Sequence, residues 1–229
     1  MSAHSSPCSI LSTLGVQALL LRLLPRLDPP VAASAVGFGT TLRLREQITA
    51  GARAQLAILT DEAIRDLAAR GILDGQSRRE LALSWVGLAV RAGAPHPSIA
   101  TLPDFLATLR ALPSIVYSQS GASGLFFADL IERLGMAEEI RAKAMIIPAG
   151  FTAEPVARGE AAAAIQQISE LMAVPGVEIV GPLPPEANAP TRFSAALFAD
   201  APPAAARLLD AIASAMTPAA LAEAGLSPP

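Results

Sequence analysis

Short apolar segments alternate with amphipathic segments along most of this chain, and this alternation constrains the fold more than any other feature. The first part of the sequence predicts strands at 8–12, 31–38, 56–59 and 83–90, and helices after Gly15 and at 42–49 and 63–70. Alternating strands and helices are typical of parallel sheets with right-handed crossover connections and with helices covering both faces. The pattern therefore indicates an α/β fold.

The alternation restarts near residue 100. It predicts strands at 114–117, 144–147, 163–168, 177–180 and 193–198, and helices at 101–105, 125–134, 153–158, 203–215 and 218–224. Only one strand accompanies the closing helices, so we expect these helices to pack on the first half. The sequence thus predicts two lobes, residues 1–88 with 195–229 and residues 89–194, each a mainly parallel sheet flanked by helices. Ligands of this fold class bind in a cleft at such sheets, here expected between the lobes.

Composition narrows the possible partners. Of the 229 residues, 52% are hydrophobic but only 4% are aromatic, which favours helices packed on a sheet over an aromatic-rich sandwich. The net charge is −3 and there is no run of four basic residues, so we expect neither nucleic acid nor an anionic membrane surface as a partner. Cys8 is the single cysteine, which leaves no internal disulfide and reads as a small apolar residue in the first strand.

The chain as written predicts a soluble protein without an export signal. Residues 1–6 contain neither a basic region nor an apolar one, and the apolar run 18–24 is too short to span a bilayer. If the sequence is complete, this feature indicates the cytoplasm.

The loop Ser118–Gly124 carries the strongest local signal for a ligand. It contains Ser120, Gly121 and Ser123 and lies between a predicted strand and a predicted helix. Glycine allows close approach of the backbone, hydroxyls donate hydrogen bonds, and the helix dipole favours an anion at this end. An ordinary helix cap is the alternative interpretation of the same residues.

Further hydroxyls occupy equivalent places after other strands. Ser12 and Thr13 follow the first strand, and Thr40 and Thr41 follow the second; each pair is also a plausible helix cap. The segment Gln166–Glu170 is expected to continue a strand, with Gln166 and Ile168 on one face and Gln167 and Ser169 on the other. Gln167 could then donate to an anion, or simply be solvated.

The common catalytic and metal signatures are missing from the sequence. The two histidines, His4 and His96, are not near other metal-ligand types, and they support no Ser-His-Asp arrangement. The glycine motifs of dinucleotide and nucleoside-triphosphate sites are missing as well. We therefore expect no metal and no cofactor. The cations best placed for a ligand are Arg43, Arg45, Arg91 and Arg192.

Several segments together carry a resemblance to a known family. They are Leu11–Val16, Phe38–Thr41, Val90–Pro95, Ser120–Phe127, Glu132–Gly135, Val156–Glu160, Gln166–Glu170 and Val177–Pro184. Over nearly its full length the chain resembles the molybdate-binding-protein-like group of type II periplasmic solute-binding proteins. The resemblance implies a two-lobed fold, a monomer, a periplasmic location and a partner permease of the ABC-transporter type.

The resemblance also implies which residues hold the ligand. In that family, hydroxyls and backbone N–H groups at helix starts bind a tetrahedral oxyanion such as molybdate or tungstate. By position, the donors here are Ser12, Thr41, the Ser120–Ser123 loop and the loop from Gly150 to Thr152. The chain departs from the family at Gln167, where a tyrosine is usual, and in segment 55–59, which lacks the usual acidic residue.

One sub-branch with the same segments resembles aconitate isomerase, so two functions stay open. The first is a binding protein that captures an oxyanion or a small di- or tricarboxylate; the second is an isomerase of a small polycarboxylate. An isomerase needs a base and a means of stabilising the resulting anion, and Glu170 or a hydroxyl would have to serve. A cytosolic ligand-sensing module is a third possibility.

Overall fold

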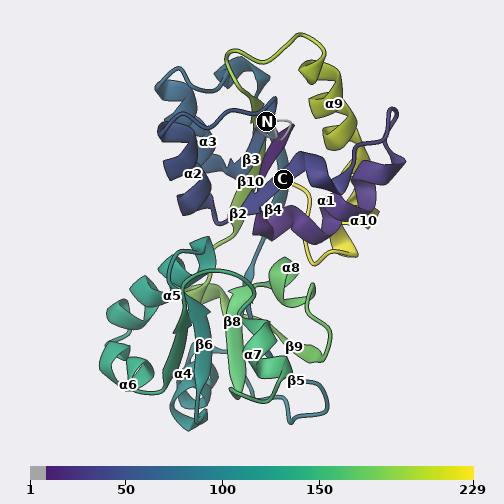
Figure 1. Cartoon of the computed structure of the whole chain (residues 1–229). Coiled ribbons are helices and arrows are strands. Elements are labelled where there is room, and N and C mark those ends of the chain that lie inside the picture. Colours follow the sequence, from purple (N-terminus) through teal and green to yellow (C-terminus); the bar gives the residue numbers. More distant parts are fainter. Residues whose placement is uncertain (1–8) are drawn as a thin grey trace, which may run out of the picture. The chain divides into compact units, whose positions relative to one another are not determined.

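The computed structural model describes residues 9–229, which fall into two compact units (Figure 1). Unit 1 contains the described residues up to Ala82 together with 192–223 and 227–229, and unit 2 contains 83–191 with 224–226. The chain thus changes unit after Ala82 and after Thr191, whereas the sequence analysis placed these changes after 88 and 194. His4 and Cys8 lie outside the described residues.

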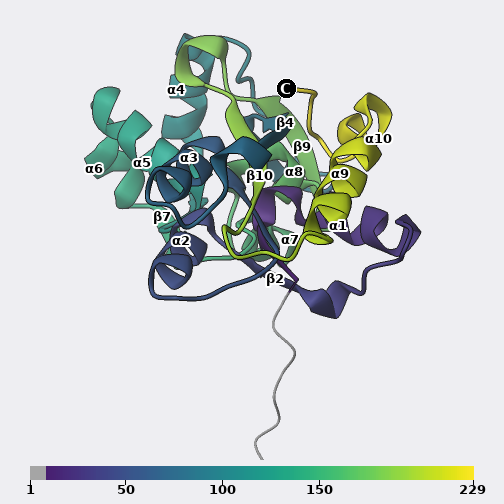
Figure 2. The same cartoon turned by 90° about the horizontal axis from the view of Figure 1, so that it is seen from above.

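Unit 1 is built on a five-stranded sheet with the order β2-β1-β3-β10-β4. Its strands are β1 (Ile10–Thr13), β2 (Val36–Gly39), β3 (Leu56–Thr60), β4 (Arg79–Ser84) and β10 (Thr191–Leu197). The first three are parallel, and β10 is antiparallel to β3. The helices are α1 (Gln17–Leu23), α2 (Thr41–Thr49), α3 (Asp61–Ala69), α9 (Ala205–Ala215) and α10 (Pro218–Ala222). Figures 1 and 2 show α2 and α3 on one side of this sheet and α1, α9 and α10 on the other, so the predicted packing of the closing helices on the first half is observed.

Unit 2 repeats this plan with the order β7-β6-β8-β5-β9. Its strands are β5 (Val86–Arg91), β6 (Ile115–Ser118), β7 (Ala144–Ile147), β8 (Ala163–Gln167) and β9 (Val177–Pro182). The parallel strands are β6, β7 and β8, while β5 is antiparallel to both β8 and β9. The helices are α4 (Leu102–Ala111), α5 (Ala122–Arg133), α6 (Ala137–Arg141), α7 (Ala153–Ala157) and α8 (Ile168–Leu171).

Helices cover both faces of the unit 2 sheet, and its central strands are buried. One face packs on α4, α5 and α6, where Phe105, Phe127 and Ile140 are fully buried. The other face packs on α7 and α8 through smaller residues such as Val156 and Leu171. Figure 1 shows α7 across the sheet from α4, α5 and α6. This two-faced burial explains why β6 and β8 are almost wholly apolar until their last residues.

The predicted α/β alternation is confirmed, but three local predictions are wrong. The single strand expected at 83–90 is two strands, β4 and β5, in different sheets, with Trp85 between them. Residues 31–35 precede β2 rather than forming its beginning. Beyond Gln167 the chain turns into α8, so the alternation of faces predicted for Ile168 and Ser169 does not occur. An apolar run shows that a segment is buried. It does not show which sheet the segment joins, or whether the chain continues as a strand or turns into a helix.

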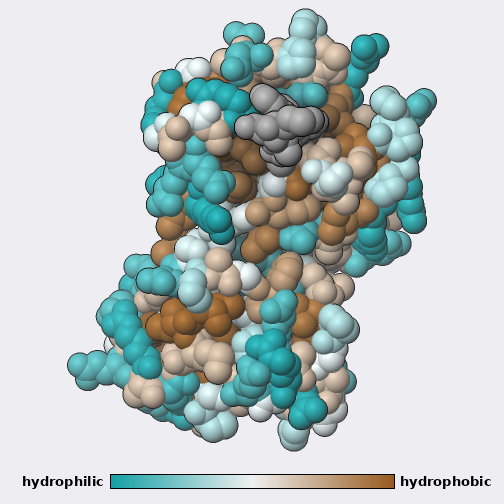
Figure 3. All heavy atoms as spheres, viewed as in Figure 1, coloured by the Kyte–Doolittle hydropathy of each residue, from teal (hydrophilic) through white to brown (hydrophobic). Residues whose placement is uncertain are grey.

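The surface is largely hydrophilic, with local apolar areas. On the face shown in Figure 3, hydrophobic atoms gather on unit 2 beside α5, and Leu125, Met145 and Ile146 are among the exposed apolar side chains of this unit. Over residues 9–229, every helix is too short or too polar to cross a membrane.

Candidate functional site

The carboxyl ends of three parallel strands lie at one edge of the unit 2 sheet. They end at Ser118 in β6, Ile147 in β7 and Gln167 in β8, and Ser118 pairs in register with Ile147. The Ser118–Gly124 loop, the Gly150–Thr152 loop and the start of α8 follow these three ends. The structure thus brings the predicted ligand loops of this unit together at the edge where α/β sheets bind ligands.

The Ser118 loop turns tightly over the end of its own strand. The Gly121 N–H donates to Ser118 Oγ at 3.1 Å, and Ser120 Oγ donates to the Pro148 carbonyl at 2.7 Å. A Cβ atom on Gly124 would lie 1.8 Å from the Ser118 carbonyl oxygen, and one on Gly121 would lie 2.4 Å from Ser118 Oγ. Glycine is therefore required at position 124, where the helix start touches the backbone of the strand end, while a side chain at position 121 would displace the Ser118 hydroxyl.

Ser123 differs from the other hydroxyls of this loop. It lies in the first turn of α5, it is 1% exposed, and its Oγ has no hydrogen-bond partner among the described residues. The helix cap role belongs elsewhere, because Gly121 is the N-cap residue and Ser118 Oγ accepts its N–H. A buried hydroxyl without a partner is uncommon in folded proteins, and a bound ion is one of the groups that can satisfy it.

The Gly150–Thr152 loop is held by Gln166, at the end of β8. Both the N–H and Oγ1 of Thr152 donate to Gln166 Oε1, at 2.8 and 3.0 Å, and Gln166 Nε2 donates to the Gly150 carbonyl at 2.8 Å. Gly150 has a φ of +104°, which favours glycine. Thr152 is fully buried and its polar groups are already bonded, so its role here is to fix the loop. This role of Gln166 is not predicted from the sequence.

Gln167 is the last residue of β8 and is buried. Its Nε2 donates to Thr191 Oγ1 at 2.7 Å, while its Oε1 is buried without a partner among residues 9–229. The solvated alternative considered for Gln167 is therefore wrong, because only 2% of the residue is exposed.

Glu170 is a buried carboxyl in α8, three residues beyond the end of β8. Burial raises its pKa to about 8, although hydrogen bonds from the Gln167 backbone and the Gln166 side chain act in the opposite direction. No arginine or lysine contributes to this balance, so the group holds its proton at neutral pH. Beside it, Ser169 Oγ lies 3.4 Å from Ser84 Oγ.

The equivalent edge of unit 1 carries the remaining predicted hydroxyls. Ser12 is fully buried and its Oγ donates to the Thr13 carbonyl at 3.1 Å. Thr40 caps α2 by accepting the Arg43 N–H at 3.3 Å. Thr41 is the first residue of α2, and its Oγ1 is buried without a partner among the described residues. Thr41 in unit 1 and Ser123 in unit 2 thus both have a buried hydroxyl oxygen without a partner among the described residues, in the first turn of a helix.

The predicted cations do not gather at these edges. Arg91 ends β5, which runs antiparallel to β8, so Arg91 lies at the opposite end of the unit 2 sheet from Gln167. Arg192 pairs with Glu80 within unit 1. Arg43 and Arg45 both lie in α2, and Arg43, two residues after Thr41, is exposed. Arg91 is therefore the one predicted site residue of unit 2 that the structure separates from the others.

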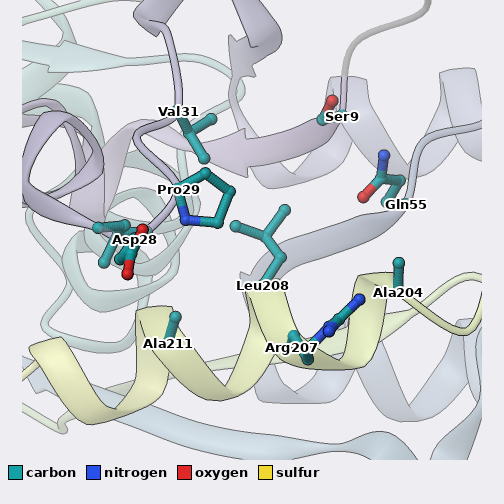
Figure 4. A pocket seen from close by; sticks show the side chains of 10 residues that line it. Ser9, Asp28, Pro29, Val31, Gln55, Ala204, Arg207, Leu208 and Ala211 are labelled. Atoms are coloured by element: carbon teal, nitrogen blue, oxygen red, sulfur yellow. The ribbon is translucent and has the colours of Figure 1, made fainter.

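A cavity of about 520 Å³ in unit 1 lies at the wrong edge for these loops (Figure 4). Ser9 and Gln55 line it just before β1 and β3 begin, and Figure 4 shows Leu208 and Pro29 near its centre. It therefore belongs to the amino ends of the parallel strands. Among the described residues, no cluster of His, Cys, Asp and Glu side chains is arranged to hold a metal ion.

Comparisons with known proteins agree with this architecture. A family model described as bacterial extracellular solute-binding protein matches residues 31–227. An aconitate isomerase from a Pseudomonas species is 33% identical, over 96% of this chain and 87% of its own. The periplasmic molybdate-binding protein of Azotobacter vinelandii has a TM-score of 0.75 at 18% identity, covering 96% of this chain and 98% of that one. The sulfate-binding protein of Mycobacterium tuberculosis has a TM-score of 0.67 at 16% identity, covering 95% and 85%.

Proposed function

Since this chain belongs to the bacterial extracellular solute-binding protein family, we propose that it binds a small di- or tricarboxylate through hydrogen-bond donors at helix starts. The observation that carries this proposal is the state of Ser123 Oγ and Thr41 Oγ1. Each is buried, has no partner among the described residues, and lies in the first turn of a helix that follows a parallel strand.

The chemistry of these positions suits an anion. At a helix start, unpaired backbone N–H groups and the helix dipole favour negative charge without any charged side chain. A carboxylate oxygen accepts from a hydroxyl and from such an N–H, and charge-assisted bonds of this kind are stronger than neutral ones. A carboxylate bound at either helix start would thereby satisfy the hydroxyl that the protein leaves unpaired there.

A carboxylate is preferred to a metal oxyanion for two reasons. The full-length relative at 33% identity is an aconitate isomerase, whereas the molybdate- and sulfate-binding proteins share the fold at 16–18% identity. Gln167 stands where the molybdate-binding group usually has a tyrosine, and Arg43, a cation, lies in the first turn of α2, two residues after Thr41. Delivery of the bound carboxylate to an ABC-type permease is the transport role that the family suggests.

Titration calorimetry with citrate, cis-aconitate, trans-aconitate, molybdate, tungstate and sulfate tests the proposal. We expect saturable binding of a carboxylate and weaker binding of the oxyanions, and Ser123→Ala should weaken the carboxylate about tenfold, which is the loss of one charge-assisted bond. Ser120→Ala is the matched control, because the Ser120 hydroxyl already donates to Pro148. The proposal fails if none of these anions binds, or if only molybdate, tungstate or sulfate binds.

Isomerisation of the bound polycarboxylate is a second candidate, and Glu170 favours it. Moving a double bond along three carbons requires removal of a proton from one end and its return at the other, with no oxidant. A carboxyl whose pKa is about 8 can exchange a proton near neutral pH, which is the range where a general acid–base group works best. The Gln166 amide contacts both Glu170 and the Gly150–Thr152 loop, so the carboxyl is connected to the proposed ligand edge.

An assay of cis/trans-aconitate interconversion separates the two candidates. An isomerase should lose nearly all turnover in Glu170→Gln, while the affinity for aconitate in calorimetry stays within a few-fold. Binding without any interconversion by the unaltered protein would leave the binding function intact and exclude the isomerase.

A further inference from the structure

A short turn near the end of the chain, Ala224–Leu226, packs on α8. These three residues belong to unit 2, although α10 before them and residues 227–229 after them belong to unit 1. Ala224 and Leu226 are buried, and Gly225 between them has a φ of +69°. The chain thus enters unit 2 for three residues only, and it buries an apolar side chain on each side of a glycine.

Gly225 lies against the first turn of α8 without space for a side chain. A Cβ atom on Gly225 would lie 2.6 Å from Met172 Sδ, 2.9 Å from Ile168 Cγ2 and 3.3 Å from the Ser169 nitrogen. Met172 is exposed and flexible enough to move, but the Ser169 nitrogen is part of the helix backbone. The glycine therefore serves two needs, its left-handed conformation and its close approach to the helix.

Another glycine contacts the other branch of the Ile168 side chain. A Cβ atom on Gly87, in β5, would lie 2.7 Å from Ile168 Cγ1. The Ile168 N–H also donates to the Trp85 carbonyl at 2.9 Å. Ile168 is the first residue of α8, so the start of this helix is held between β5 and the Ala224–Leu226 turn.

The start of α8 also carries two of the candidate ligand residues. Gln167 is its N-cap residue, and the Glu170 carboxyl accepts a hydrogen bond from the Gln167 N–H. A glutamate that bonds back to the N-cap N–H in this way moves with the helix start. We propose that the Ala224–Leu226 turn, through Gly225, is a positioning element that holds the first turn of α8 and with it the buried Glu170 carboxyl. Its importance for ligand chemistry rests on the proposed function.

The charged groups on the elements around α8 leave the Glu170 carboxyl as a clean reporter of this contact. Arg91 in β5 and Glu178 in β9 lie at the opposite end of the sheet from Gln167. Glu223, next to the turn, is paired with Arg22. Burial is the largest cause of the raised pKa of Glu170, and no charged side chain contributes to it. Displacement of α8 that admits water should therefore lower this pKa.

Gly225→Ala tests the contact, and Gly71→Ala is its matched control. Gly71 also has a φ of +69°, but a Cβ atom there would meet nothing within 4 Å. Both variants thus carry the same backbone strain, and only Gly225→Ala pushes on α8. Infrared pH titration follows the band of the protonated Glu170 carboxyl, which is identified by its loss in Glu170→Gln. We expect the pKa of Glu170, about 8 in the unaltered protein, to fall by at least about one unit in Gly225→Ala and to stay unchanged in Gly71→Ala.

A second pair of variants covers the case in which Gly225→Ala does not fold in a thermal unfolding check. Leu226→Ala loosens the turn by removing a buried side chain, and Leu67→Ala removes one from α3 in unit 1. The pKa of Glu170 should fall only in Leu226→Ala. The proposal is overturned if the folded variant of the turn leaves this pKa unchanged, or if its control lowers the pKa equally.

The effect on ligand chemistry is measured separately. If the unaltered protein interconverts the aconitates, Gly225→Ala should lower kcat about tenfold to a hundredfold and shift its pH profile, with KM changed only a few-fold, because the carboxyl is displaced rather than lost. An unchanged kcat and pH profile would contradict the positioning role. If the unaltered protein neither binds nor converts a carboxylate, the proposed function fails, and the infrared titration still decides whether the turn positions α8.

Discussion

The two units have the same strand order, and in each an acidic residue follows the third parallel strand. The pKa of this residue is shifted in opposite directions in the two units. In unit 1, Asp61 begins α3 directly after β3; in unit 2, Glu170 lies in α8 just after β8. Burial would raise the pKa of Asp61, but hydrogen bonds from Ser194 and Arg65 and the charge of Arg78 outweigh it and lower the pKa. Glu170 has only amide partners, and its pKa rises to about 8.

This difference gives the two acids different roles: Asp61 is structural, whereas Glu170 is able to exchange a proton. Asp61 is a permanent anion that ties α3 to β10 through Ser194 and to β4 through Arg78, which lies just before that strand. Glu170 is a neutral acid that can change its protonation within the physiological range. Each unit thus has an acid within three residues of the end of its third parallel strand, and the neighbouring arginines decide what that acid can do.

The largest effect is expected from the glycines that follow the first parallel strand of each unit, β1 and β6. In Gly124→Ala the new Cβ would lie 1.8 Å from a backbone carbonyl, whereas in Gly15→Ala it would lie 2.3 Å from the Phe193 ring, a side chain. Because a backbone moves less readily than a ring, we expect Gly124→Ala to cost more than about 4 kcal/mol of unfolding free energy and Gly15→Ala about 1–3 kcal/mol. Urea denaturation measures both.

Gly75→Ala serves as the control for these glycines. Its new Cβ would have only an ordinary contact, at 3.5 Å from Ala68, and its φ is not positive. We expect a change below about 0.5 kcal/mol. If Gly124→Ala were no more destabilising than Gly75→Ala, the tight turn described for the Ser118 loop would be wrong.

The second effect is a pH dependence of stability that differs between the two acids. Glu170 binds its proton more tightly in the folded state, so its contribution is full below pH 4.5 and is lost as the pH rises towards 8. From pH 6 to pH 8 the unaltered protein should lose about 2 kcal/mol more unfolding free energy than Glu170→Gln, which has no proton to release. Urea midpoints at several pH values measure this slope.

Asp61→Asn gives the opposite test. Because the pKa of Asp61 is lowered, its contribution is present above pH 3.8 and is lost as the pH falls below that value. Asp61→Asn should therefore be less stable than the unaltered protein at pH 7 and approach it near pH 3. If the stability difference from the unaltered protein changed with pH in the same way for Asp61→Asn and Glu170→Gln, the opposite pKa shifts of the two acids would be wrong.

The sequence could predict the sheets because burial leaves a direct pattern in them. Segments such as Leu56–Leu59 and Ser114–Tyr117 are apolar because helices cover both sheet faces, and the hydroxyls after them mark the strand ends. The protonation of Glu170 was out of reach, because it depends on the absence of arginines contributed by other elements. Likewise, the hydrogen bonds from Thr152 to Gln166 join a loop to strand β8, and no local pattern encodes the distance between them. Arg91 was misplaced because the direction of β5 was unknown.

The third effect contrasts a satisfied hydroxyl with an unsatisfied one. Thr152 Oγ1 donates to Gln166, so Thr152→Val should cost about 1–2 kcal/mol, while Ser123→Ala should leave unfolding free energy unchanged or slightly raised. Thermal unfolding without ligand measures both. A clear destabilisation by Ser123→Ala would mean that its hydroxyl has a partner within the fold and is not reserved for a ligand.

The smallest effect concerns Arg91, and it tests the polarity of the unit 2 sheet. Arg91 lies at the end of β5 opposite to the carboxyl ends of β6 and β8, so Arg91→Ala should change carboxylate affinity by less than about twofold, the scale of a remote surface substitution. Arg43→Ala is the matched comparison, because Arg43 lies in the first turn of α2 beside Thr41. Calorimetry should show a lower affinity for the carboxylate in Arg43→Ala but not in Arg91→Ala. Loss of binding in Arg91→Ala would instead locate the ligand at the amino ends of the parallel strands, and it would overturn the assignment of the Ser118 loop.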